Sequence, residues 1–155
     1  MDKQHMQGSY GRFAAMVLTS TVVMYAVMYL NTYSLDHVYF SETRLYMALV
    51  MGATMAMVML AFMLGMYSNR KTNALIFVGS ALVFLVALWL VRSQATVDQV
   101  SWMKAMIPHH SIAILTSERA TIEDPRVREL ADGVIESQRR EIEQMKRLVS
   151  ELQTQ

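Results

Sequence analysis

The sequence predicts an all-α membrane protein in which three transmembrane helices are followed by an exported helical hairpin. Two observations predict this fold. Residues 13–33, 45–67 and 74–91 contain no charged side chain, although 17% of the 155 residues are charged. Each segment comes close to or exceeds the roughly 20 apolar residues that a helix needs to cross a bilayer. Residues 93–155, in contrast, are polar, and their apolar side chains recur at helical spacing.

Charges between the apolar segments predict the orientation in the membrane. Lys3 and Arg12 precede the first segment, and Arg70 and Lys71 lie between the second and third, whereas residues 34–44 contain a single cation. By the positive-inside rule the N-terminus is cytoplasmic, so the C-terminal segment lies outside after three crossings. We therefore predict a bacterial inner (cytoplasmic) membrane protein with a periplasmic or extracellular C-terminal domain.

This pattern divides the chain into two domains. Residues 1–92 are predicted to form an N-terminal tail and the three transmembrane helices, and residues 93–155 the exported domain. The lipid bilayer is thus the first predicted partner. The formal net charge is only +1, so nothing in the composition indicates nucleic acid binding.

The exported domain is predicted to form two antiparallel helices. Asp98 is a suitable N-cap for the first, which is expected to run to about residue 120. Asp124 followed by Pro125 is a strong start signal for the second, which is expected to run to about residue 152. Because residues 92–97 contain neither Gly nor Pro, we expect little break between the third transmembrane helix and the hairpin.

The hairpin is small for an independent domain, and one face of its second helix is apolar. We expect this face to be covered by a second copy of the chain, so that two hairpins form a four-helix bundle of ferritin-like type. Docking onto the transmembrane helices is the alternative. The apolar face comprises Val127, Leu130, Ala131, Val134, Ile135, Ile142, Met145, Leu148, Val149 and Leu152.

A candidate metal-binding motif lies in residues 102–110, Trp-Met-Lys-Ala-Met-Ile-Pro-His-His. On a helix Met103, Met106 and His110 fall on one face, and His109 lies on its flank. Thioether sulfur is a soft, neutral ligand and imidazole a borderline one. Together they select Cu(I) or Ag(I) over Zn(II), Mg(II) or Ca(II). The chain contains no cysteine, which suits an oxidising compartment in which free thiols pair.

Other residues are candidates to complete this site. Met145 lies on the facing apolar stripe and is a predicted ligand. Gln138 and Glu141 interrupt that stripe and are predicted to orient an imidazole N–H, unless they only make polar contacts in a bundle interface. Asp36 and His37 lie in a loop on the same predicted side of the membrane. They form a candidate accessory ligand pair, unless His37 is an ordinary exposed loop residue.

The last 60 residues also carry a recognisable pattern: Asp98, Met103, Met106 to His110, Ala113, Asp124-Pro125 and the run 138–145. In this pattern residues 95–153 resemble domain-of-unknown-function family 305, also described as CopM-like. The resemblance implies a ferritin-like helical bundle that binds copper or silver through Met and His, and it adds no known enzymatic activity. The family usually has Met six residues after the second histidine, where this chain has Thr116.

Methionine is concentrated in the second transmembrane segment, which holds seven of the chain's 15 methionines. Two interpretations compete. These methionines are flexible side chains that pack the helix bundle, or they pass Cu(I) from one thioether to the next. Five of them recur every four residues and form a slowly spiralling ladder along the helix: Met47, Met51, Met55, Met59 and Met63.

The sequence therefore predicts a membrane-anchored Cu(I)- or Ag(I)-binding protein that acts in metal tolerance by sequestration or relay outside the cytoplasm. It is not predicted to be an enzyme, because it lacks the Glu-x-x-His pairs of ferritin-like di-iron proteins. Further copies of the chain, a copper exporter and a periplasmic copper chaperone are the predicted protein partners. A Cu(I) transporter or channel that uses the ladder is one alternative, and an oligomeric membrane scaffold with incidental metal binding is another.

Overall fold

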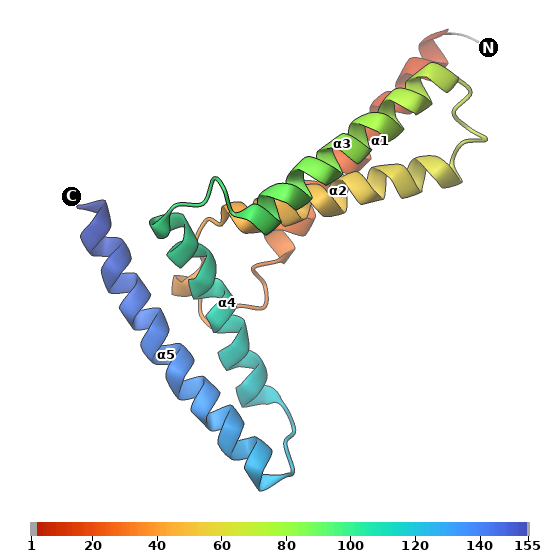
Figure 1. Cartoon of the computed structure of the whole chain (residues 1–155). Coiled ribbons are helices and arrows are strands. Elements are labelled where there is room, and N and C mark those ends of the chain that lie inside the picture. Colours follow the sequence, from red (N-terminus) through yellow and green to blue (C-terminus); the bar gives the residue numbers. More distant parts are fainter. Residues whose placement is uncertain (1–2, 155) are drawn as a thin grey trace. The chain divides into compact units, whose positions relative to one another are not determined.

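The computed structural model is entirely helical in its regular elements within residues 3–154, which are the residues it describes; side chains are described from residue 10. A one-turn 3-10 helix separates the first two α-helices (Figure 1). This confirms the prediction of an all-α chain. The elements are α1 (Lys3–Val27), η1 (Leu35–His37), α2 (Glu42–Phe62), α3 (Arg70–Ser93), α4 (Gln99–Arg119) and α5 (Pro125–Gln153).

The chain divides into two compact units. The first, here called the apolar unit, comprises Met1–Val27 and Thr43–Ala95 and contains α1, α2 and α3. The second, the hairpin unit, comprises Met28–Glu42 and Thr96–Gln155 and contains η1, α4 and α5. The loop between α1 and α2 therefore belongs with the C-terminal hairpin, although it is remote from the hairpin in sequence.

Three helices are long and apolar enough to cross a membrane. Their candidate spans are Tyr10–Val27, Glu42–Phe62 and Arg70–Ser93. Each span overlaps a segment predicted from the sequence and begins a few residues before it, because the helix already includes the polar residues at its start. Lys3, which entered the orientation argument, has a side chain outside the described ones.

α2 packs through its smallest side chains. Ala48, Gly52 and Ala56 recur every four residues and are all buried, and the larger Leu60 continues this buried row. At Gly52 the neighbouring helix comes so close that an added Cβ would lie 2.2 Å from the Oγ1 atom of Thr21 in α1. Small residues at this spacing allow close packing of helices in a membrane. They therefore determine which face of α2 meets its neighbours.

The methionine ladder flanks this buried row of α2: Met47, Met51, Met55 and Met59 each precede one of its residues by one position. Met63 lies just beyond the end of the helix. Met47 is 39% exposed, and Met51, Met55, Met59 and Met63 are half-buried. Met59 and Met63 also pack against the apolar cluster around Phe13, Ala56, Leu60 and Tyr67. Packing against neighbouring helices thus occupies part of each ladder side chain and leaves part of it accessible.

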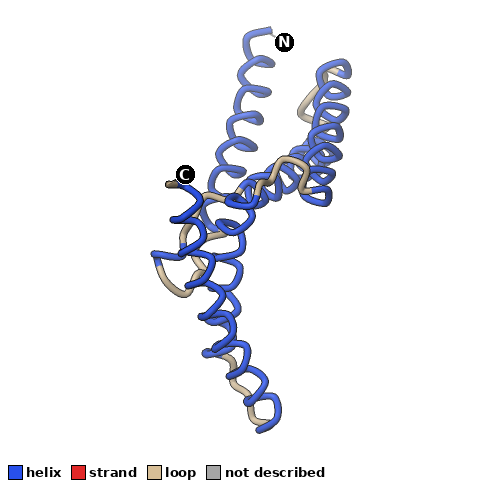
Figure 2. The backbone as a smooth tube through the Cα atoms, turned by 60° about the vertical axis from the view of Figure 1, so that its left-hand side comes forward, coloured by secondary structure: helices blue, strands red, loops and turns tan. Residues whose placement is uncertain are grey.

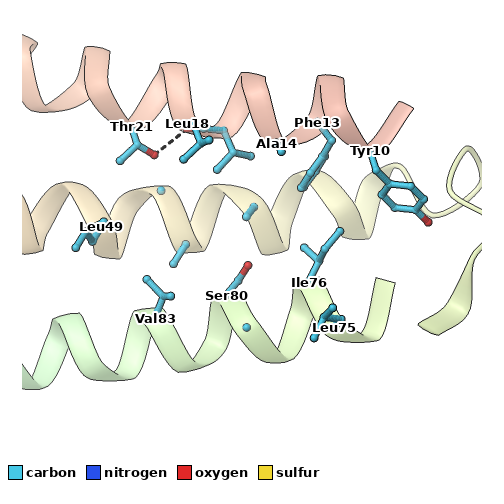
Figure 3. A pocket seen from close by; sticks show the side chains of 15 residues that line it. Tyr10, Phe13, Ala14, Leu18, Thr21, Leu49, Leu75, Ile76, Ser80 and Val83 are labelled. Carbon is cyan, nitrogen blue, oxygen red and sulfur yellow. Dashed lines mark hydrogen bonds between the residues drawn. The ribbon is translucent and has the colours of Figure 1, made fainter. Parts of the chain in front are cut away.

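A cavity of about 530 Å³ lies among α1, α2 and α3 (Figure 3). Its lining is mainly apolar, and two of its hydroxyl groups already have acceptors. The Thr21 hydroxyl donates to the Val17 carbonyl at 2.8 Å, and the Tyr10 hydroxyl donates to Asn73 Oδ1 at 2.7 Å. The described residues that line this cavity include no ladder methionine, so the ladder and the cavity are separate features of the apolar unit.

The structure corrects the expectation of little break between the third helix and the hairpin. α3 ends at Ser93, and Gln94 adopts a left-handed conformation with φ of 53°. The Gln94 N–H donates to the Leu90 carbonyl at 3.0 Å, and Nε2 donates to the Val91 carbonyl at 2.7 Å. The left-handed backbone of Gln94 is the conformation in which a glycine usually ends a helix, and its side-chain amide satisfies one more of the last carbonyls. A search for Gly and Pro alone therefore missed this helix end.

Adding a methyl group at Gly52 is expected to weaken the packing of α1 against α2. In Gly52→Ala the new Cβ would meet Thr21, so the free energy of unfolding should fall by about 1–3 kcal/mol. Thermal unfolding of the purified chain in detergent, followed by circular dichroism, measures this change. Gly79→Ala is the matched control, because a Cβ at Gly79 would meet no atom of a neighbouring element within 4 Å among the described residues. Equal stability of the two variants would contradict the close approach.

Candidate functional site

The two helices that carry the predicted motif and its facing stripe run antiparallel, side by side (Figures 1 and 2). Their N-caps are the two predicted aspartates. The Asp98 carboxylate accepts a hydrogen bond from the Ser101 N–H at 2.7 Å, and the Asp124 carboxylate accepts one from the Arg126 N–H at 2.9 Å. The backbone N–H of Ser101 lowers the pKa of Asp98, and the Arg126 side chain lowers that of Asp124.

Two of the predicted methionine ligands belong to the core of the hairpin. Met103 is 5% exposed and Met145 is 7% exposed. Met106 is half-buried and packs against the edge of the same cluster. Flexible thioethers pack well in an irregular core, so these methionines have a structural role whether or not they bind a metal. The other buried members are Ile107, Ile114, Ile142 and Val149.

His110 is held by two polar contacts. Its Nδ1 atom lies 2.9 Å from the Met106 carbonyl oxygen, and its Nε2 atom lies 2.7 Å from Glu141 Oε2. Both partners are acceptors, so both contacts are satisfied together only when each ring nitrogen carries a hydrogen. In the neutral tautomer with hydrogen on Nδ1, the carbonyl still fixes the ring and the Nε2 lone pair becomes free to bind a metal ion.

A cavity of about 220 Å³ brings together Met103, His110 and Met145. Glu141 also lines it, with a side chain that is 50% exposed, and so does Trp102. Two thioethers and one imidazole therefore border one space, with a carboxylate near solvent. Neutral donors of this softness suit Cu(I) or Ag(I). Within residues 3–154, no group of three or more His, Asp or Glu is placed to hold a metal ion.

Other predicted site residues lie outside this cavity. His109 is exposed, and its ring centroid lies 6.1 Å from that of the neighbouring histidine. Met106 and Gln138 are half-buried, and neither lines the cavity. Thr116 is exposed, and its hydroxyl donates to carbonyl groups of its own helix. The thioether that the family pattern places at Thr116 would therefore not lie in the lining of this cavity.

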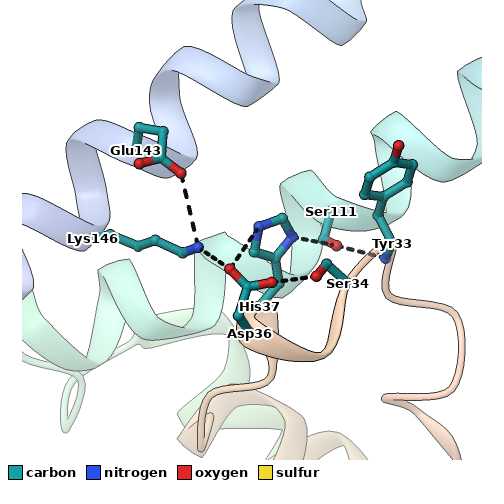
Figure 4. Close-up of polar contacts among 7 residues, drawn as sticks. All are labelled: Tyr33, Ser34, Asp36, His37, Ser111, Glu143 and Lys146. Carbon is teal, nitrogen blue, oxygen red and sulfur yellow. Dashed lines mark hydrogen bonds and ion pairs between the residues drawn. The ribbon is translucent and has the colours of Figure 1, made fainter.

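The loop between α1 and α2 docks on the hairpin through a polar cluster (Figure 4). The Tyr33 N–H donates to Ser111 Oγ at 2.7 Å, and the Nδ1 atom of His37 lies 2.9 Å from the same oxygen. The Lys146 ammonium donates to Asp36 Oδ2 at 2.5 Å. Together these contacts attach the loop to both α4 and α5.

His37 is buried, at 9% exposed, which corrects its interpretation as an ordinary exposed loop residue. Burial lowers the pKa of His37, and the neighbouring Asp36 opposes that shift. The hydrogen bond from Lys146 is the largest cause that lowers the pKa of Asp36 to about 2, followed by one from Ser34. Asp36 and His37 thus contribute to docking of the loop.

Sequence reasoning missed Ser111 and Lys146 because a single Ser or Lys on a helix has no motif around it.

A family model described as "Domain of unknown function (DUF305)" matches residues 51–149, which is more than half of the sequence. The chain therefore belongs to this family. The match begins inside α2 and so extends well beyond the C-terminal stretch that first suggested the resemblance. The chain is also similar to "Uncharacterized protein L153" of Acanthamoeba polyphaga mimivirus, with 29% identity over 148 residues that cover 91% of this chain and 95% of that protein. No solved structure matches it.

Acidification is expected to weaken the docked loop through His37. Its pKa is lowered in the folded chain, so below about pH 6.5 the unfolded chain binds a proton that the folded chain does not, and stability falls. Asp36 stays charged in this range because its pKa is about 2. Lys146 and Glu143 are the other charged side chains that act on the imidazole.

The measurement is the unfolding temperature of the full chain in detergent at about pH 7.5 and about pH 5.5. His37→Gln keeps a hydrogen-bonding side chain that does not titrate, so its unfolding temperature should fall less on acidification than that of the wild type. His109→Gln changes an exposed histidine and serves as the control. An equal pH dependence in wild type and His37→Gln would show that His37 does not contribute.

Proposed function

We propose that this protein binds Cu(I) or Ag(I) and serves in copper or silver tolerance by sequestering or relaying the ion on the outer side of a bacterial inner membrane. The supporting observation is the cavity that Met103, His110 and Met145 share. All three ligands are neutral when His110 binds through Nε2. The Glu141 carboxylate beside them balances the charge of a monovalent ion. This chemistry is binding and transfer, without catalysis.

Binding requires a rearrangement of one contact. Glu141 faces the Nε2 atom of His110, so the carboxylate has to release that nitrogen before the nitrogen can donate its lone pair. The Met106 carbonyl keeps hold of Nδ1 during this exchange and preserves the ring orientation. Glu141 is therefore an acceptor that holds the ring without metal and a nearby anion once the ion is bound.

The predicted ligands outside the cavity are placed to bind the ion before it enters the cavity. His109 is exposed directly before His110, and Met106 lies one helical turn before it at the edge of the core. We assign them to an entry position from which an ion reaches the three cavity ligands. Gln138 is half-buried on the facing helix, where its amide can hydrogen-bond to a ligand of that entry position.

Self-association belongs to this proposal. Val127 is 48% exposed and Leu130 is 69% exposed, so the hairpin unit does not itself cover the N-terminal part of the predicted apolar stripe. A second hairpin that packs there would complete a four-helix bundle. A copper exporter or a periplasmic copper chaperone would be the donor or acceptor of the ion.

The methionine ladder supports a second candidate function, a Cu(I) transporter or channel. Met47, Met51, Met55 and Met59 lie within one candidate membrane span, Met63 directly follows it, and each is partly accessible. In this function the hairpin cavity would load or unload the ladder. A third candidate is a membrane scaffold that functions through its oligomer and binds metal only incidentally. The two experiments below separate these functions.

Anaerobic titration of the full chain with Ag(I) or Cu(I) tests the binding site. The full chain is needed because the loop at residues 28–42 is part of the hairpin unit. We expect saturable binding that weakens at least about tenfold in His110→Ala and in Met145→Leu. His109→Ala should lose less, since His109 lies outside the cavity. No saturable binding in the wild type would refute the metal function and favour the scaffold.

Replacing Met51, Met55 and Met59 together with Leu tests the ladder. Leu has nearly the same volume and no sulfur, so packing should survive. If the protein sequesters or relays the ion at the hairpin, Ag(I) affinity should match the wild type and Cu(I) flux into proteoliposomes should be the same as in empty vesicles for both proteins. Wild-type flux that is lost in the triple variant would instead establish the transporter.

A further inference from the structure

We propose that the indole of Trp102 caps the ion in the hairpin cavity and contributes to its selectivity for a soft, monovalent cation. This inference rests on the proposed metal-binding function and deepens it. It concerns a side chain that contributes no lone pair to the ion and that a search for ligands therefore passes over.

The position of Trp102 at the mouth of the cavity carries the proposal. Trp102 lines the same cavity as Met103, His110 and Met145. Met103 and Met145 are almost fully buried, whereas Trp102 is 50% exposed, so Trp102 is the solvent-accessible part of a lining whose two thioethers lie in the core. The backbone N–H of Trp102 donates to the Asp98 carbonyl at 2.8 Å, which holds this residue in the first turn of α4.

The chemistry of the indole suits the ion that the cavity ligands select. An aromatic face carries negative electrostatic potential, and among aromatic side chains that of Trp attracts cations most strongly. Because the thioethers and a neutral imidazole bring no charge, the indole and Glu141 supply the negative potential around the ion. The attraction grows as water is excluded, and a half-buried indole excludes water from one side of the cavity.

The same arrangement discriminates between metals. Zn(II) in proteins is usually held by four N, S or O ligands, and Cu(II) prefers a square arrangement of N and O ligands. An indole at the mouth offers neither type of donor and leaves less room for the water that would otherwise complete those sets. Two thioethers and one imidazole under an aromatic ring therefore favour an ion that tolerates few, soft ligands.

The chain provides a direct optical test because it contains only two tryptophans. Trp89 lies in α3, is 60% exposed and belongs to the other unit. In Trp89→Phe the remaining fluorescence reports on Trp102 alone. Ag(I) is added anaerobically to this full-length variant in detergent, and bound ion is measured in parallel by calorimetry. We expect the Trp102 emission to change and to saturate at the same ion-to-protein ratio as binding.

Substitutions at the indole provide the second readout. Trp102→Leu should weaken Ag(I) binding by about threefold to tenfold, and Trp102→Phe by less, because it keeps an aromatic face. The selectivity of Trp102→Leu for Ag(I) over Zn(II) should fall as well. Trp89→Leu is the matched control and should bind as the wild type does. Circular dichroism verifies that each variant is folded. If Trp102→Leu does not fold, Trp102→Phe provides the test of the indole instead.

The outcomes separate the two proposals. Saturable Ag(I) binding without a change in Trp102 emission, or with full affinity in Trp102→Leu, would overturn the role of the indole and leave the metal site intact. Loss of the emission change in His110→Ala would tie the signal to the cavity. Absence of saturable binding to the wild type would overturn the metal function, and the role of Trp102 with it.

Discussion

Two antiparallel helices cannot enclose a core by themselves, and this constraint shapes the hairpin unit. The loop between α1 and α2 supplies a third element. Its Tyr39 packs against the apolar cluster of α4 and α5, and Tyr33 and His37 share the Ser111 hydroxyl. The loop is polar where it meets the helices, so it adds directed hydrogen bonds to an interface that apolar packing alone leaves thin.

The loop and the cavity use neighbouring residues of the same two helices. Ser111 directly follows His110, and Lys146 directly follows Met145. Adjacent positions on a helix point about 100° apart, so each helix presents one side chain to the loop and the next to the cavity. The loop contacts therefore hold the two helices in the register that places a thioether of α5 opposite the imidazole of α4.

The helices could be predicted because their signals are local. Charge-free segments, Asp98 as an N-cap and the Asp124-Pro125 pair each identify an element from a few adjacent residues. Helical periodicity also placed Met103 and His110 on one face of the first helix, and it placed Met145 on the apolar face of the second. The rest depended on tertiary structure. Periodicity could not separate Met106 from Met103 and His110, because all three lie on one broad face of α4. It also gave no reason to expect a loop 74–78 residues away to dock on Ser111. Gln94 ended α3 with a side-chain amide that no composition rule identifies.

The thioethers of Met103 and Met145 connect the chemical durability of the hairpin to its packing. Oxidation converts a methionine into a polar sulfoxide, which would remove a proposed soft ligand and place a polar group in the core in a single event. At 5% and 7% exposure, both sulfur atoms are shielded for as long as α4 and α5 stay together. Dense packing around these two sulfur atoms therefore protects them from oxidation. Any opening of the hairpin would expose both sulfur atoms to damage that repacking alone could not reverse.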